Sequence, residues 1–276
     1  SNTSSIKLVN LTHNRLEFIK EHYFKVLTKL ERLLLAKNKI SSIDKSSFQN
    51  LVLLEELDLS DNNLFKIEKD LFKNLNNLRI LNLNQNLIKK IDSSFYYIDS
   101  LTDLSLSNNL ISIFFLKTNK LQNLTKLDLS ENYYLIEINI ENKMKLESIN
   151  LNNNHRLKIL KSFQSLPNLR NFYLTNLNSK FLRVYRYIPP IIIDLVVSHI
   201  NMNDLAWKSV FQNYNKISVL ALRNSIVEQH FINHLALDKI DLSSSDILWS
   251  NNMIFLNESF NLKIIILRNT NLNNMI

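Results

Sequence analysis

The chain has 276 residues, of which 45% are hydrophobic and 21% are charged, and its formal net charge is +8. This balance is typical of a folded globular domain and excludes a disordered chain. Cysteine and glycine are both absent, which excludes disulfides, thiolate metal sites, a cysteine nucleophile and every phosphate-binding motif built on glycine.

An apolar motif of the form LxxLxLxxNxL begins at Ile6 and recurs to the end of the chain. Its seven regular copies are centred on Asn14, Asn38, Asn62, Asn86, Asn109, Asn132 and Asn154. The alternating apolar positions predict one short strand per copy, with Leu57 and Leu59 facing inward and Asp58 facing outward. Such strands are expected to stack in parallel. The repeated Asn is expected to hydrogen-bond backbone groups of neighbouring turns, which the bend would otherwise bury unpaired.

A second motif, F-x-x-L-x-x-L, lies between the first strands, where it starts at Phe24, Phe48, Phe72 and Phe95. Its spacing of three residues predicts a helical or 3₁₀ turn on the convex side. The four rings are expected to form a column inside the solenoid. Because glycine is absent, any turn that needs a positive φ must be made by Asn, Asp or another residue.

Five further copies of the strand motif are weaker, and the position of the Asn is taken by Leu177, Ile200, Ser225, Ser245 and Thr270. Ser and Thr still offer one hydrogen bond at this position, whereas Leu and Ile offer none. We therefore predict a break in the polar ladder at the eighth and ninth turns, with a change of curvature or register. Pro189 and Pro190 favour the same interpretation, because both lack a backbone donor. We expect one domain over residues 1–276, with regular repeats over about 6–168 and divergent repeats over about 169–276, about twelve in all.

These motifs resemble the leucine-rich repeat family, in particular its typical 24-residue extracellular subclass found in Toll-like receptors, chaoptin-like adhesion proteins and small leucine-rich proteoglycans. The resemblance implies an α/β solenoid: a right-handed superhelix, or horseshoe, with a concave parallel β-sheet and irregular or short helical convex connections. It also implies a non-catalytic module that recognises proteins, glycans or microbial products in innate immunity or cell adhesion, outside the cell. The cysteine-rich caps of such ectodomains are missing, so we expect one or both caps to be absent or replaced.

An intracellular scaffold or regulatory subunit is the alternative, since the lack of cysteine is no obstacle to it. The longest apolar runs, at 191–197 and 264–267, are too short to cross a bilayer. A signal peptide and a membrane span in the complete open reading frame would favour the extracellular function.

Four N-x-S/T sequons occur, at Asn2, Asn10, Asn123 and Asn257. Glycans on them would indicate an extracellular protein, although a chain rich in Asn, Ser and Thr contains sequons by chance. Asn10 lies at an outward position of the first strand, where a glycan would block that end of the concave face.

Few residues have the spacing that a catalytic or metal-binding site requires. His230 and His234 are four residues apart, a spacing that suits two metal ligands on a helix, but no third ligand accompanies them and His234 occupies a core position of the convex motif. No nucleophile and base are spaced to act together. We expect no catalysis, metal, cofactor or small-molecule substrate.

Basic residues are concentrated between 142 and 190, where nine Lys and Arg stand against the single acid Glu147. The residues selected as a polyanion-binding belt are Lys158, Lys161, Arg170, Lys180, Arg183 and Arg186. Such a belt attracts sulfated glycans, anionic lipid or nucleic acid. The alternative is a solubilising surface in a lysine-rich chain.

The outward central residues of the predicted strands change character at Tyr173. Before it they are polar except for Leu34, whereas apolar residues dominate after it. The predicted partner-binding stripe consists of Tyr173, Val196, Val219, Ala221, Ile264 and Ile266. Such a stripe fits a protein ligand, a co-receptor or a partner in a homo- or heterodimer. The alternative is a register shift that places some of these side chains in the core.

Overall fold

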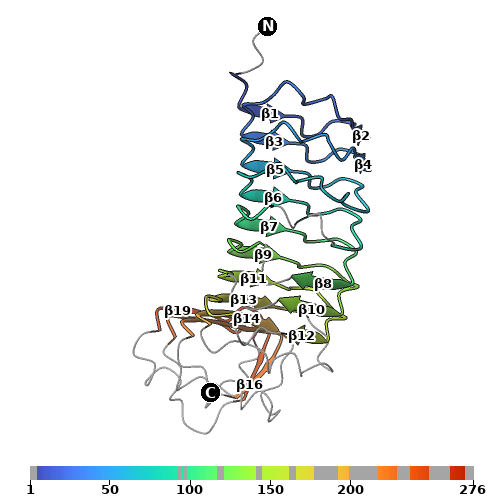
Figure 1. Cartoon of the computed structure of the whole chain (residues 1–276). Coiled ribbons are helices and arrows are strands. Elements are labelled where there is room, and N and C mark those ends of the chain that lie inside the picture. The colour runs from blue at the N-terminus through green and yellow to red at the C-terminus, as the bar shows by residue number, and fades with distance from the viewer. Residues whose placement is uncertain are drawn as a thin grey trace.

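The computed structural model is a solenoid of stacked parallel strands (Figure 1). It describes residues 5–91, 95, 98–116, 121–140, 145–161, 166–176, 192–198, 217–228, 237–248 and 262–270. Twelve strands form the main sheet, in chain order, one from each expected repeat. They are β1 (Leu8–Asn10), β3 (Arg32–Leu34), β5 (Glu56–Asp58), β6 (Ile80–Asn82), β7 (Asp103–Ser105), β9 (Lys126–Asp128), β11 (Ser148–Asn150), β13 (Asn171–Leu174), β14 (Asp194–Ser198), β15 (Val219–Arg223), β17 (Lys239–Asp241) and β19 (Ile264–Ile266).

Three small parallel sheets follow the main strands on the lateral side of the solenoid. The first joins β2 (Phe18–Ile19) and β4 (Ser42–Ile43), the second joins β8 (Ile113–Leu116), β10 (Glu137–Ile140) and β12 (Ile159–Lys161), and the third joins β16 (Ile226–Glu228) and β18 (Asp246–Leu248). The repeat motifs do not predict these sheets.

In the main strands, buried and outward side chains alternate as the sequence predicts. Leu57 and Leu59 are fully buried, whereas Glu56 and Asp58 are half-buried on the outward side. The register pairs equivalent residues in successive repeats, so Leu57 lies between Leu33 and Leu81. The inward side chains of the described turns consequently form one continuous apolar core, except in β19, where Ile265 is exposed.

The repeated Asn connects each turn to the turn before it. The Nδ2 of Asn86 donates to the carbonyls of Leu83 (3.1 Å) and Asn84 in its own turn, and to Leu59 of the preceding turn (2.9 Å). Its Oδ1 accepts from the backbone N of Leu64 at 3.0 Å. Equivalent bonds occur at Asn38, Asn62, Asn109 and Asn132. The predicted ladder is confirmed in these repeats.

In the divergent repeats hydroxyl groups continue the ladder with fewer bonds. Ser245 donates to the carbonyl of Leu222 at 2.7 Å and accepts from the backbone N of Ser225, while Thr270 donates to Leu242 at 3.0 Å. The one hydrogen bond predicted for a hydroxyl at this position is confirmed for Thr270, whereas Ser245 makes one as donor and another as acceptor. Leu177 and Ile200, where we predicted the break, lie outside the described residues, as does the Pro189–Pro190 pair.

Wherever the structure describes it, the residue before a ladder position adopts the left-handed conformation. Positive φ angles of 49° to 62° occur at His13, Lys37, Asp61, Gln85, Asn108, Glu131, Asn153, Asn176, Asn224, Ser244 and Asn269. A side chain makes this conformation costly, and Asn tolerates it best. The expectation that residues other than glycine must make these turns is confirmed.

The convex connections consist of turns, and the described residues contain no α-helix. In the F-x-x-L-x-x-L motif, the backbone N of Leu51 donates to the carbonyl of Phe48 and that of Leu54 donates to Leu51, each at 3.0 Å. These three-residue bonds are of the 3₁₀ type that the spacing predicts. The rings of Phe24 and Phe48 stack inside the solenoid with centroids 6.3 Å apart.

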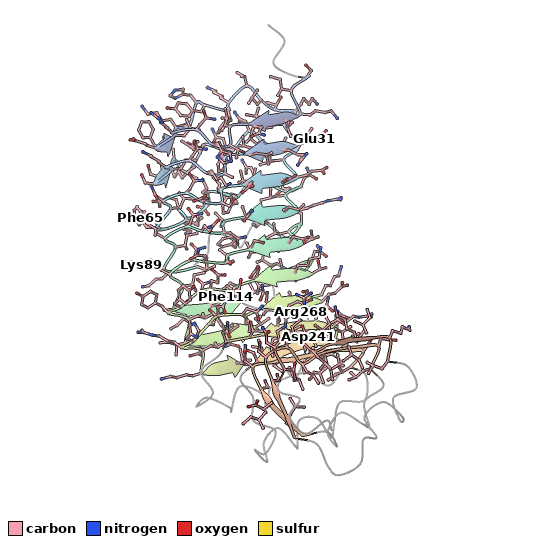
Figure 2. The ribbon with its side chains drawn as sticks, turned by 180° about the vertical axis from the view of Figure 1, so that it is seen from behind. Glu31, Phe65, Lys89, Phe114, Asp241 and Arg268 are labelled. Carbon is pink, nitrogen blue, oxygen red and sulfur yellow. The ribbon has the colours of Figure 1, made fainter. Side chains whose placement is uncertain are left out.

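The stack changes direction in its last third. Figure 1 shows the strands from β1 to β11 as one column, whereas β14 and β19, which are separated by β15 and β17 in the sheet, are drawn at nearly the same height at its base. The side-chain view of Figure 2 places Glu31 on the side of the main sheet and Phe65 and Lys89 at the outer edge of the opposite side. The solenoid therefore presents a main-sheet face and a lateral face with different side chains.

Replacing Asn86 by Ala should lower the free energy of unfolding by roughly 3 kcal/mol, because buried backbone groups of two turns lose their partners. The midpoint of urea denaturation followed by circular dichroism measures the effect. Asn77→Ala is the matched control, since Asn77 is exposed and makes one bond, to the carbonyl of Val52. Equal losses in both variants would contradict the stabilising role of the ladder.

Replacing Lys37 by Gly should raise the free energy of unfolding by about 0.5–1 kcal/mol, because Lys37 is exposed and its φ of 54° is unfavourable for a residue with a Cβ. Thermal unfolding of the two proteins in the same buffer provides the comparison. Lys37→Ala removes the same side-chain atoms beyond Cβ but keeps the strain, so it should bring no gain. A gain of equal size from Ala would show that the side chain, and not φ, is responsible.

Candidate interaction site on the concave sheet

The predicted partner-binding residues form a true row on the main sheet. In the register of the strands, Tyr173 lies beside Val196, Val196 beside Ala221, Ala221 beside Asp241, and Asp241 beside Ile266. A second row places Val219 and Ile264 on either side of Lys239. The structure therefore brings together the six residues that the sequence selected.

The row is less exposed than expected at one position. Tyr173, Val196 and Ile266 are half-buried, and Ile264 is 49% exposed, but Ala221 is only 4% exposed. The inclusion of Ala221 in an accessible stripe is wrong, because its short methyl group lies between the longer side chains of Val196 and Asp241. Burial of Ala221 divides the stripe into two separate parts.

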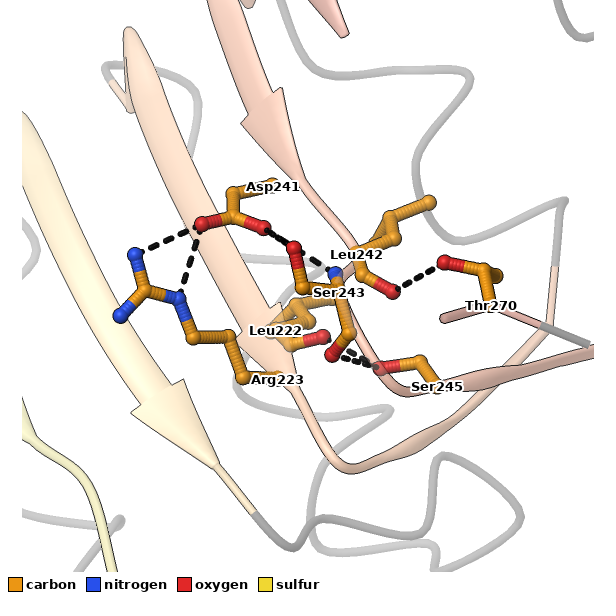
Figure 3. A network of polar contacts seen from close by, with 7 residues as sticks. All are labelled: Leu222, Arg223, Asp241, Leu242, Ser243, Ser245 and Thr270. Atoms are coloured by element: carbon orange, nitrogen blue, oxygen red, sulfur yellow. Dashed lines mark hydrogen bonds and ion pairs between the residues drawn. The ribbon is translucent and has the colours of Figure 1, made fainter. Parts of the chain in front are cut away.

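An ion pair between the exposed Arg223 and the buried Asp241 lies between these two parts (Figure 3). Asp241 is 4% exposed, and its Oδ2 accepts from Nε and Nη2 of Arg223 at 2.8 and 2.7 Å. Its Oδ1 accepts from the backbone N and the hydroxyl of Ser243 at 3.0 and 2.5 Å. Burial alone would raise the pKa of Asp241, but the hydrogen bonds from Ser243 and the charge of Arg223 together hold it below its ordinary value.

The repeat pattern does not predict this pair, although a signal for it is present. The tripeptide Asp-Leu-Ser occurs four times, and at Asp58, Asp128 and Asp241 its Asp is the last residue of a main strand, whereas Asp103 is the first residue of β7. In the three copies at a strand end the carboxylate accepts from the backbone N and the hydroxyl of the Ser two residues later. At the end of a main strand the motif thus marks outward carboxylates whose hydrogen bonds are satisfied within the sheet.

Tyr173 lies next to a carboxylate of a different kind. Asp194 is half-buried and stands one strand away, beside Asn171. Its carboxylate has no hydrogen-bond partner among the described residues, and burial raises its pKa, with Lys239 opposing the change. Burial and the negative charge of Asp194 raise the pKa of the Tyr173 hydroxyl, which therefore stays protonated at neutral pH. A phenol on one strand and, on the next, a carboxylate without a hydrogen-bond partner among the described residues suit a partner group that donates hydrogen bonds or carries a positive charge.

The first half of the concave face differs, because several of its polar side chains are bonded to the backbone or to each other within the sheet. Asn82 and Asn84 bond the backbone at Asn84 and Ser107, and the hydroxyl of Ser130 bonds that of Ser107 at 3.0 Å. Lys126 pairs with Asp103 at 3.0 Å. This half presents satisfied groups, so Tyr173 and Asp194 are the stronger candidate site.

The predicted polyanion-binding residues are only partly described. Lys158 and Arg170 are exposed, but Lys158 precedes the lateral strand β12, whereas Arg170 precedes the main strand β13. The backbone of Lys161 belongs to β12. Lys180, Arg183 and Arg186 lie outside the described residues, so a belt of six cations remains a prediction.

Two of the four sequons can be placed. Asn10 is exposed at the end of β1, and its Oδ1 accepts from the backbone N of Thr12. Asn123 is half-buried, with Nδ2 donating to the carbonyl of Asp99 and Oδ1 accepting from Lys145, both at 2.8 Å. Asn10 is therefore the more accessible of the two. Asn2 and Asn257 lie outside the described residues.

Other chemistry is not found in the part of the chain that the structure describes. It contains no group of three or more His, Asp or Glu side chains arranged to hold a metal ion. His230 and His234 are outside it. Within the described ranges no helical segment has the length and hydropathy that a bilayer crossing requires.

Two family models match the sequence. The leucine rich repeat model matches residues 4–64 and 54–111, and the BspA type leucine rich repeat region matches residues 89–185. Together they cover well over half of the chain. The chain belongs to the leucine-rich repeat family. Leucine-rich repeat domains are commonly protein-interaction modules and generally non-enzymatic. No curated protein matches the sequence.

Solved structures show the same repeat fold at low sequence identity. The leucine-rich repeat domain of APL1B is 18% identical, with a TM-score of 0.72, over 98% of this chain and 78% of that chain. The LRIM1/APL1C complex gives 17% identity and a TM-score of 0.55 over 97% and 57% of the two chains. A complex of TLR13 with ssRNA13 is 18% identical, with a TM-score of 0.51, over 97% of this chain and 53% of that chain. At these identities the likeness extends to the fold alone.

Because Asp241 is charged when it pairs with Arg223, we expect the free energy of unfolding of this leucine-rich repeat domain to depend on pH. Because the folded-state pKa of Asp241 lies below its ordinary 3.8, the stabilisation is complete above that pH and is lost as the pH falls through the folded-state value. Asp241→Asn should therefore lower the free energy of unfolding by about 1–3 kcal/mol at pH 7, with a smaller difference below pH 3.8. Urea denaturation at both pH values measures this.

Asp103→Asn is the control for Asp241, because Asp103 is less buried than Asp241 and its ion-pair partner Lys126 is exposed. The Asp103→Asn substitution should change the free energy of unfolding by less than about 0.5 kcal/mol. A difference between Asp241→Asn and the native protein that is independent of pH would contradict the role assigned to the charged form.

Proposed function

We propose that this leucine-rich repeat domain is the recognition part of an extracellular receptor or secreted protein, and that it binds a protein partner through Tyr173 and Asp194. The supporting observation is the contrast along the concave sheet, where polar groups before Tyr173 satisfy each other and Asp194 lacks a hydrogen-bond partner among the described residues. A Tyr side chain in the middle of a sheet face is a frequent energetic centre of protein interfaces.

The ring of Tyr173 and the carboxylate of Asp194 both favour a positively charged group on the partner. A Lys or Arg side chain would lie against the ring of Tyr173 and pair with the carboxylate of Asp194. Val196 and Val219, both half-buried, border these groups and supply the apolar part of the contact. Pairing would also relieve the cost of leaving the Asp194 carboxylate partly buried without a partner.

Innate immunity or cell adhesion is the setting that we propose for this recognition. The family resemblance supports it, and so does the shared fold of APL1B and TLR13. An anionic glycan is a second class of ligand that the exposed Lys158 and Arg170 would suit.

Site-specific photocrosslinking tests the concave site. Benzoylphenylalanine at position 173 should give one covalent adduct when the protein is incubated with intact cells of its source, and Asp194→Asn should reduce the yield at least about tenfold. Benzoylphenylalanine at position 82 and Asp103→Asn are the controls, because both positions lie on the paired half of the same sheet. Equal adducts from positions 82 and 173 would refute the site.

The cellular location of the protein is tested separately by antibody staining of intact and permeabilised cells. Mass spectrometry of the tryptic peptide that contains Asn10 shows whether this Asn is modified. Staining of intact cells supports the extracellular function. Staining only after permeabilisation, with Asn10 unmodified, would contradict it and favour the intracellular scaffold.

A further inference from the structure

A second distinctive surface lies on the lateral side of the solenoid, away from the concave sheet. We define the lateral flank as the exposed side chains of residues 87–90, 110–115, 133–136 and 155–158, which follow the ladder Asn in the fourth to seventh repeats. They lie on the side that carries β8, β10 and β12 in Figure 1, and Figure 2 shows Lys89 at the outer edge of that side.

The flank arises from a change in the repeat. In the fifth repeat one residue separates Asn109 from the buried Ile111, whereas two residues, Tyr133 and Tyr134, separate Asn132 from the buried Leu135. The seventh repeat has the same extra residue, with His155 and Arg156 in these places. The longer connection holds both side chains outside the core.

Six large apolar or aromatic side chains are exposed on the flank. They are Leu87 (46%), Ile113 (56%), Phe115 (36%), Tyr133 (46%), Tyr134 (49%) and Ile136 (40%). Neighbouring turns bring them together, because Ile113 pairs with Glu137 in the lateral sheet and the backbone N of Ile136 donates to Ser112 at 2.8 Å. Exposed apolar side chains gathered in this way usually mark an interaction surface.

Cations border the apolar side chains at both ends. Lys89 and Lys90 are exposed beside Leu87, and Arg156 and Lys158 are exposed beyond the tyrosines. The segments 87–90, 110–116, 133–140 and 155–161 contain five Lys and Arg against one acid, Glu137. The flank is therefore both apolar and positively charged.

Ring contacts across two turns hold the aromatic part in place. The rings of Tyr133 and His155 are parallel within 5°, with centroids 5.8 Å apart, and the guanidinium carbon of Arg156 lies 5.2 Å from the ring centre of Tyr134. The four exposed side chains thus form two ring contacts between neighbouring turns, one of them with the guanidinium of Arg156.

We propose that the lateral flank docks on the surface of a bilayer that contains anionic phospholipids. The aliphatic and aromatic side chains enter the headgroup region, and the cations bind phosphate and carboxylate groups of the lipids. A sulfated glycan would engage the cations but would leave six apolar side chains unused. A protein interface is depleted in Lys, whereas Tyr and Lys are the residue types that a membrane interface favours.

Cosedimentation with vesicles tests this proposal with the whole chain. Binding should be clear with vesicles of phosphatidylcholine and phosphatidylserine, weak with phosphatidylcholine alone, and should decrease as salt rises. The double variant Tyr134→Ser/Arg156→Gln should bind the mixed vesicles at least about tenfold more weakly.

The control is Phe65→Ser/Lys66→Gln, which removes an exposed aromatic and cation pair from the third repeat of the same side. Phe65 is 51% exposed and Lys66 lies 5.8 Å from its ring centre, but Lys66 is already paired with Glu68. This variant should bind as the native protein does. Lys89→Gln/Lys90→Gln is a second test variant that changes only exposed side chains, and it should also bind more weakly.

Three outcomes would overturn the proposal. The first is equal binding to neutral and mixed vesicles. The second is equal binding by native protein and both flank variants. The third is a lack of vesicle binding together with a different loss in the flank variants. Loss of retention on heparin would assign the flank to a soluble polyanion. Loss of self-association in sedimentation velocity would assign it to a second copy of the chain. Native circular dichroism of each variant excludes a folding defect. The test does not involve Tyr173 or Asp194, so its result is independent of the concave site.

Discussion

The hydrogen bonds of the repeated Asn are the interaction on which the solenoid depends. A parallel stack with short strands leaves carbonyl and N–H groups at each bend buried between turns, and these groups need partners. The amide of Asn62 or Asn86 supplies them to its own turn and to the turn before it. Each turn is thereby fixed against its neighbour in the register that also stacks the buried leucines. The left-handed residue before the Asn is a consequence, because the chain must reverse there without a glycine.

Changes in this ladder coincide with the two surfaces that carry the proposals. The ladder Oδ1 of Asn154 is buried without a hydrogen-bond partner, because the extra residue after Asn132 directs the backbone N of Leu135 to the carbonyl of Asn132 itself. The same extra residue exposes Tyr133 and Tyr134 on the flank. Beyond this point the ladder continues through hydroxyls such as Ser245, with fewer bonds per turn, and the stack changes direction in Figure 1. Tyr173 and Asp194 lie at this transition.

Much of the fold could be predicted from spacing alone, because the strand period, the Asn interval and the F-x-x-L-x-x-L turns are local properties that repeat. The row that contains Tyr173 and Val196 was predictable for the same reason. The burial of Ala221 and Asp241 was not, since it depends on the sizes of side chains on neighbouring strands and on the position of Arg223 two residues beyond Ala221. The lateral flank was missed because its residues follow the Asn, where the motif specifies only one inward position and leaves the others unconstrained.

The two surfaces differ in the kind of specificity that their chemistry supports. At the concave site, Tyr173 and Asp194 offer a few directional groups on a rigid sheet, and discrimination there comes from the cost of leaving the Asp194 carboxylate unpaired against a wrong partner. On the lateral flank, apolar area and cations from four repeats act additively without a defined geometry. A receptor that used both would gain from orientation, because a flank held at a lipid surface presents the concave sheet at a fixed angle to ligands in the medium. Local concentration at the membrane would then add to the affinity of the concave site without any new contact.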